Sequence, residues 1–147
     1  MKKILFILAT FFFLQSCGTL GGFEIITLPV SKSKLNSAID SLYKNFPEYK
    51  IPAKWEYLND WQDRGYGFLD GKIFYFNNDP EEMYYVSFIH DDSTMDTLYT
   101  ETRLSIRAVN KGQRKWLLNK DLNRSERKRI TERFKKEIIL KLKNYIR

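Results

Sequence analysis

A short segment between residues 55 and 63 carries the side chains that carbohydrate chemistry uses. Three carboxylates interleave there with three aromatic rings: Glu56, Asp60 and Asp63 with Trp55, Tyr57 and Trp61. Aromatic faces stack on sugar rings, and a pair of carboxylates supplies the acid and the base or nucleophile of glycoside hydrolysis. The same pattern is typical of tryptophans in a core with the acids on a solvated edge, so both interpretations stay open.

The only histidine, His90, precedes Asp91, Asp92 and Ser93. With a serine from elsewhere it would complete a Ser-His-Asp triad, but the chain has no Gly-x-Ser-x-Gly elbow, and a histidine beside acids in a turn is more often a solvated loop residue. One histidine cannot make a typical zinc site, and Thr97 stands where a calcium loop needs glycine. We expect no metal and no cofactor.

The single cysteine, Cys17, follows a stretch with the pattern of a secretory signal. Lys2 and Lys3 give it a positive start, an apolar run covers residues 4–14, and a small residue precedes the cysteine. A helix needs about 20 apolar residues to cross a bilayer, so this run is too short for a stable span.

Residues Leu14-Gln15-Ser16-Cys17 resemble a bacterial lipobox, although Gln15 is larger and more polar than most lipoboxes carry. The resemblance implies a cut before Cys17, lipid on its thiol, and acylation of the new amino group by a fatty acid such as palmitate. It implies a signal peptide over 1–16 and a lipidated tether over 17–23. Gly18 resembles the residue that permits sorting to the outer membrane, so we expect a lipid anchor there with the protein facing the periplasm.

The remaining segment, 24–147, has the length of one domain, and no linker or repeat divides it. Its charge is uneven: residues 17–102 carry seven Lys and Arg against fourteen Asp and Glu, whereas residues 103–147 carry sixteen against four. A basic chain can bind nucleic acid, but a secreted, anchored protein does not routinely meet it, so we expect no nucleic acid partner.

Hydrophobic periodicity predicts a strand at 24–30, then a helix capped by Ser31 and ended by Pro47. Residues 48–64 fit a strand or one helical turn. A turn at Asp70-Gly71 predicts a hairpin between 66–69 and 72–76. Further strands are expected at 83–89, 97–109 and 114–118, with Gly112 in a left-handed conformation, and a long helix from Asn123 to Tyr145.

These elements predict an α+β fold in which an antiparallel meander packs against an N-terminal helix and a long C-terminal helix. The order resembles helix-grip and TATA-binding-protein-like architectures. Some envelope lipoproteins that assist outer-membrane assembly have helix-grip domains, and the resemblance extends to element order alone. In the strand at 97–109, Leu104, Ile106 and Ala108 are expected on one face, with the other face wet.

Alternation places large side chains on both faces of this sheet, and a helix layer covers only one. The other face is therefore a candidate partner-binding surface, unless the segment 48–64 folds over it. The residues proposed for it are aromatic: Trp55, Trp61, Tyr75, Tyr85 and Tyr99.

The C-terminal helix has a basic stripe, which is either a solvated face or a contact with anionic lipid or an acidic protein. Its residues are Arg129, Arg133, Lys136, Lys143 and Arg147. We expect a non-catalytic envelope lipoprotein that binds a protein, peptide or glycan. The alternative is a small cell-envelope or glycan hydrolase with carboxylates from 56–63 or near His90.

Overall fold

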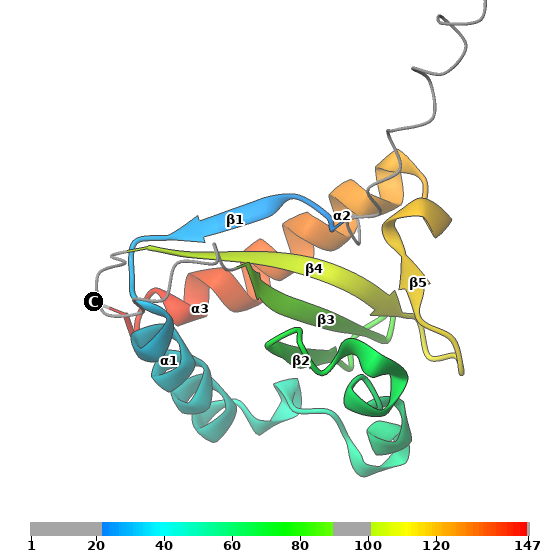
Figure 1. Cartoon of the computed structure of the whole chain (residues 1–147), viewed down its shortest axis with the longest axis horizontal. Coiled ribbons are helices and arrows are strands. Elements are labelled where there is room, and N and C mark those ends of the chain that lie inside the picture. The colour runs from blue at the N-terminus through cyan, green and yellow to red at the C-terminus, as the bar shows by residue number, and fades with distance from the viewer. Residues whose placement is uncertain (1–21, 90–100, 147) are drawn as a thin grey trace, which may run out of the picture.

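The computed structural model describes residues 22–89 and 101–146. The predictions on the lipobox with Cys17, on His90, on Tyr99 and on Arg147 lie outside these residues. The described chain confirms the α+β fold: a five-stranded antiparallel sheet with helices, ordered β1-β4-β3-β2, with β5 paired to β4 (Figure 1).

The first strand and first helix form as the sequence predicts. β1 (Ile25–Leu28) lies at the sheet edge and pairs with β4. α1 (Lys32–Asn45) begins after Ser31, whose side chain accepts a hydrogen bond from the backbone N–H of Lys34. This cap satisfies an amide that has no partner inside the helix, and Pro47 starts a separate 3-10 turn.

The meander consists of β2 (Gly71–Phe76), β3 (Glu82–Ile89), β4 (Thr102–Asn110) and β5 (Leu117–Leu118). Gly112, in the β4–β5 connection, has φ 69°, the left-handed conformation that was predicted. β5 covers only the last two residues of the strand predicted at 114–118.

The hairpin predicted at Asp70-Gly71 is wrong. Residues 66–69 form no strand, and β2 pairs instead with β3, with Gly71 opposite Ser87. The apolar side chains of Tyr66 and Leu69, which suggested a strand, pack against the aromatic cluster on one face of the sheet. Asp70 is held by an ion pair with Lys32 at 2.7 Å.

A bulge in β4 changes which face its residues occupy. Ala108 pairs with Tyr85, but Ile106 pairs with the next residue, Val86, so β4 carries one extra residue at Arg107. Ala108 therefore packs with the second face, while Leu104, Ile106 and Val109 pack with the first. The expectation that Ala108 shares a face with Ile106 is wrong.

The first face of the sheet carries the larger core, which both helices cover. Side chains from α1, such as Leu35 and Leu42, and from the C-terminal helix, such as Ile130 and Phe134, are fully buried there against Phe74 and its neighbours. Their 3.6-residue spacing gives each helix one apolar stripe.

The second face is covered by the segment after α1. The turns over this face are η3 (Ala53–Leu58) and η4 (Gln62–Tyr66), where the sequence allowed a strand or one helical turn. The turn before them, η2 (Pro47–Tyr49), places Tyr49 in the core of the first face. Leu58 and Trp61 pack there with Ile73, Met83 and Trp116. Ser105, on the face of β4 that was expected to be wet, is only 1% exposed, so that prediction is wrong at this residue.

The long C-terminal helix comprises α2 (Arg124–Phe134), a wider turn η6 (Lys135–Ile139) and α3 (Leu140–Leu142). Asn123 caps it by accepting a hydrogen bond from the N–H of Glu126 at 2.9 Å, as predicted. The wider turn lets two consecutive residues, Ile138 and Ile139, both face the core. Figure 1 shows this helix running along the sheet past β1 and β4.

Candidate functional site

The aromatic residues predicted to bind a partner are mostly inside the protein. Trp61, Tyr75 and Tyr85 are 6%, 8% and 4% exposed. The interpretation of this face as an open binding surface is wrong, and the alternative, that residues 48–64 cover it, is correct. Trp55 is half-buried against the same cluster.

The carboxylates of residues 56–63 are held locally. Glu56 accepts a hydrogen bond from Asn59 at 3.1 Å, and Asp60 pairs with Arg64 at 2.7 Å. Asp63 lies on the exposed side of η4. Neither of the two surface hollows described below is lined by these acids.

Glu81 fastens the covering segment to the sheet. Its Oε1 accepts hydrogen bonds from Lys54 Nζ at 2.6 Å, from Tyr75 Oη at 2.6 Å and from Trp55 Nε1 at 3.1 Å. The hydrogen bond from Lys54, followed by those from Tyr75 and Trp55, lowers the pKa of Glu81 to about 2. Two donors come from the cover and one from β2, so this carboxylate joins the two layers.

Two residues of the predicted basic stripe, Arg129 and Arg133, are paired with the buried carboxylate of Glu82. Its side chain is fully buried and forms ion pairs with Arg129 and, at 3.1 Å, with Arg133. Tyr84 donates a further hydrogen bond to it at 2.7 Å. A buried carboxylate needs such partners because burial strips away its hydration. Arg129 and Arg133 therefore fasten the helix to β3, and the prediction of one continuous stripe is wrong.

Several other cations of the helix lie on its other side, beside residues 22–28. Two surface hollows, each of about 400 Å³, lie between this helix and the N-terminal segment. We call them together the β1 groove. The distal hollow is lined by Ile26, Thr27, Leu28, Glu132, Lys135, Lys136, Ile139, Leu140 and Lys143. Lys136 and Lys143, from the predicted stripe, therefore line this groove.

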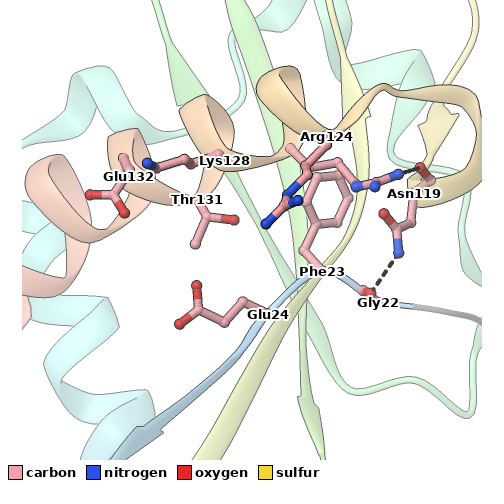
Figure 2. Close-up of a pocket in the computed structure, with 9 residues that line it drawn as sticks. Gly22, Phe23, Glu24, Asn119, Arg124, Lys128, Thr131 and Glu132 are labelled. Atoms are coloured by element: carbon pink, nitrogen blue, oxygen red, sulfur yellow. Dashed lines mark hydrogen bonds between the residues drawn. The ribbon is translucent and has the colours of Figure 1, made fainter.

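The proximal hollow lies where the described chain begins. It is lined by Gly22, Phe23, Glu24, Asn119, Arg124, Arg127, Lys128, Thr131 and Glu132. Figure 2 shows the residues of α2 on one side and Gly22, Phe23 and Glu24 on the other, with Asn119 at one end. The hollow thus has one wall of helix and one wall of extended chain.

Hydrogen bonds fix the end of the proximal hollow near Asn119. The Asn119 side chain donates to the carbonyl of Gly22 at 3.0 Å. Arg127 Nη1 donates to the carbonyls of Leu122 at 2.8 Å and Asn119 at 3.3 Å. In the described part of the chain, the buried Oδ1 of Asn119 has no hydrogen-bond partner.

The groove carries a surplus of positive charge. Its cations are Arg124, Arg127, Lys128, Lys135, Lys136 and Lys143. Its two carboxylates are Glu24, which pairs with Lys135 at 2.8 Å, and Glu132. This arrangement favours negatively charged groups, and the apolar floor of the distal hollow favours an apolar side chain beside them.

Sequence reasoning missed Arg124, Arg127, Lys128 and Lys135 as a group. Arg124, Lys128 and Glu132 follow each other at four-residue intervals, which places them in one row of the helix. That row was visible in the sequence. What marks it as a site is the neighbouring segment of residues 22–24, and the sequence does not reveal that contact.

Comparison with protein-family models, with curated proteins and with solved structures gives no match for this chain. None of the helices within residues 22–89 and 101–146 has the length and apolar character needed to cross a bilayer. The site is therefore defined by its own geometry.

Proposed function

We propose that the protein is a non-catalytic lipoprotein of the bacterial envelope. Lipid on Cys17 anchors it to the outer membrane facing the periplasm, and the distal hollow binds an extended, acidic segment of a partner protein. The observation that carries this proposal is an edge strand, β1, lying beside a lysine-lined hollow.

The edge of β1 supports binding of an extended segment. Within the described residues β1 pairs with β4 alone, so its second edge has backbone groups available to a further strand. Adding a strand to a sheet edge is a common mode of peptide recognition, in which main-chain hydrogen bonds give affinity and alternate side chains give specificity.

The side chains beside β1 define the partner's chemistry. Lys135 already pairs with Glu24, but Lys136 and Lys143 still outnumber Glu132, so acidic side chains are favoured. Leu140 is 56% exposed and lies in the same hollow, where it would contact an apolar side chain of the partner. The partner segment is therefore extended, acidic and interrupted by apolar residues.

Site-specific photo-crosslinking in cells tests this function. A photo-reactive residue at Thr27, in β1, is expected to crosslink to one partner protein, and peptide mapping is expected to place the bond in an acidic, extended segment. The matched control is Phe68, which is 73% exposed and lies in the segment that covers the opposite face of the sheet. Equal crosslinking from both positions, or a mapped segment that is basic, would contradict the proposal.

A charge reversal adds a second readout. Lys136→Glu with Lys143→Glu is expected to lower binding of a synthetic peptide of the mapped segment at least tenfold, because both lysines line the hollow. Lys44→Glu with Lys50→Glu makes the same change in net charge on exposed residues elsewhere and should leave binding unchanged. The anchor is tested separately by mass spectrometry, where an unmodified Cys17 thiol on membrane-extracted protein would refute it.

A further inference from the structure

The end of the molecule at which the described chain begins carries cations that the partner-binding role does not use. We propose that this end docks on the surface of an anionic phospholipid membrane. This inference rests on the lipid anchor of the proposed function, because the anchor brings this end to a membrane. It names the surface through which the anchored domain meets the bilayer.

The proposed contact surface, which we call the tether patch, consists of five exposed cations. They lie in the β4–β5 turn, in η5 (Asn119–Asp121) and in the N-terminal part of α2: Arg114, Lys115, Lys120, Arg124 and Lys128. None of the five belongs to the basic stripe predicted from the sequence. Within residues 22–89 and 101–146 none of them forms an ion pair, so their charge is available to an external partner.

The carboxylates of this region do not neutralise the tether patch. Residues 111–128 contain seven Lys and Arg against two Asp and Glu. Glu126 pairs with Lys111 and Arg129, and Asp121 accepts a hydrogen bond from a backbone N–H at 2.8 Å. A surplus of exposed charge of one sign is attracted to a surface of the opposite sign.

The cations of the tether patch lie at one end of the molecule. Figure 1 shows β5 and the start of α2 at this end, with α1 and α3 at the other. The ion pair between Lys111 and Glu126 joins the β4–β5 turn to α2. The Asn110 side chain donates hydrogen bonds to the carbonyls of Gln113 at 2.5 Å and Lys115 at 3.1 Å, and these bonds hold the turn in shape.

The chain enters the domain at this same end. The carbonyl of Gly22 accepts a hydrogen bond from the Asn119 side chain at 3.0 Å, and Asn119 directly precedes Lys120 in the sequence. A Cβ on Gly22 would lie 2.2 Å from Oγ of Ser105, so the chain enters in close contact with the sheet. The beginning of the domain is therefore fixed beside the tether patch.

The distance to the anchor allows the tether patch to reach a membrane. Gly22 lies five positions after Cys17 in the sequence, and at most about 3.5 Å of extended chain per residue limits their separation to roughly 18 Å. Attraction of exposed cations to an anionic membrane fades over a Debye length of about 8 Å at physiological salt. A lipid on Cys17 would hold the patch near enough to the headgroups for this attraction to orient the domain.

Docking through the tether patch leaves the partner site open. Leu140, which lines the distal hollow, lies sixteen residues after Arg124 on the long C-terminal helix. At 1.5 Å per residue this separation is roughly 24 Å. The membrane and the partner segment would therefore occupy different parts of the surface.

The test uses the protein extracted from membranes and placed in lipid nanodiscs, either of phosphatidylcholine alone or of phosphatidylcholine with anionic phosphatidylglycerol. A fluorophore is attached to one new cysteine, Ser125→Cys beside the patch or Ser37→Cys on α1, both at exposed positions, and lipid headgroups carry a quencher. In anionic discs we expect at least threefold more quenching from Ser125→Cys than from Ser37→Cys. The excess should disappear in neutral discs and in 1 M salt, where the Debye length is about 3 Å.

Two results of this measurement would overturn the proposal. Equal quenching from the two positions in anionic discs would show that this end does not face the membrane. The same excess in neutral discs would show that the tether alone, and not charge, places it there.

Charge variants decide whether the tether patch itself makes the contact. Lys120→Gln with Arg124→Gln and Lys128→Gln is expected to remove the excess quenching. The control removes the same charge from three exposed lysines elsewhere and should preserve the excess: Lys34→Gln, Lys44→Gln and Lys50→Gln. An equal loss in both sets would show attraction by net charge alone and would refute the patch.

Failure of this inference is distinguishable from failure of the proposed function. The quenching needs no partner protein, and neither labelled position lines the distal hollow. Mass spectrometry of the same sample shows whether Cys17 carries lipid. If it carries none, the anchor is refuted and the unlabelled protein is mixed with vesicles of the same two compositions. Flotation with the anionic vesicles alone would then support the patch, whereas flotation with neither, or equally with both, would refute it.

Discussion

Trp61 stacks on Tyr85 with ring centroids 4.1 Å apart and planes 9° from parallel. Trp61 comes from the segment after α1 and Tyr85 from the central strand β3, so this contact covers the second face of the sheet. Trp116 packs against the same indole at 5.3 Å. The aromatic side chains that suggested a binding surface, Trp61, Tyr75 and Tyr85, are therefore buried inside the protein.

Replacing Trp61 with alanine should therefore destabilise the whole domain. Removing a buried tryptophan typically lowers the free energy of unfolding by about 3 to 5 kcal/mol, because the contacts are lost and a cavity is left. Urea denaturation measures this change. Phe68→Ala, at a side chain 73% exposed, is the control and should change stability by less than about 0.5 kcal/mol. Similar values for both variants would show that the stack does not hold the cover.

Glu82 should contribute more to stability than Glu137, the other carboxylate that pairs with Arg133. Glu82→Gln leaves the cations of Arg129 and Arg133 without their buried partner, and breaking such a pair typically lowers the free energy of unfolding by about 3 to 5 kcal/mol. Glu137→Gln removes a more exposed partner of Arg133 and should lower it by less than about 1 kcal/mol. Chemical denaturation of the two variants checks the contrast, which equal losses would refute.

Acid should loosen the covering segment through Glu81. Its folded-state pKa of about 2 lies below the ordinary value of 4.5, so its contribution to stability is fully present above pH 4.5 and is lost as the pH falls towards 2. The free energy of unfolding of the protein, measured in urea across this range, should fall more steeply than that of Glu81→Gln. If the free energy of unfolding fell equally with pH in the two proteins, the ionised Glu81 carboxylate would not be stabilising the folded state.

Gly71 should not tolerate a side chain. A Cβ at this position would lie 2.5 Å from Cζ of Tyr85, which is itself packed under Trp61. Gly71→Ala is expected to lower stability by about 1 to 3 kcal/mol through overpacking. Gly67→Ala is the matched control, because the nearest atom to its Cβ would be 3.8 Å away. Thermal melting compares the pair, and equal melting temperatures would contradict the close approach.

Much of the secondary structure was determined by the sequence alone. Ser31 and Asn123 cap their helices because each can accept a hydrogen bond from an amide three residues later. Alternation placed Phe74 and Phe76 on one face of β2 and Tyr75 on the other, and Gly112 marked its turn. These features depend on neighbours a few residues apart, so local chemistry is sufficient to predict them.

Only the tertiary structure decided which charged and apolar residues remain on the surface of the protein. Arg133 and Glu82 are 51 positions apart, and their ion pair removes a cation from the stripe that helical periodicity predicts. The bulge at Arg107 moves Ala108 to the other face of β4, and no local signal marks it. The β1 groove likewise exists because residues 22–28 and 124–143 lie side by side. Contacts between distant segments depend on how the whole chain packs, which residue spacing does not encode.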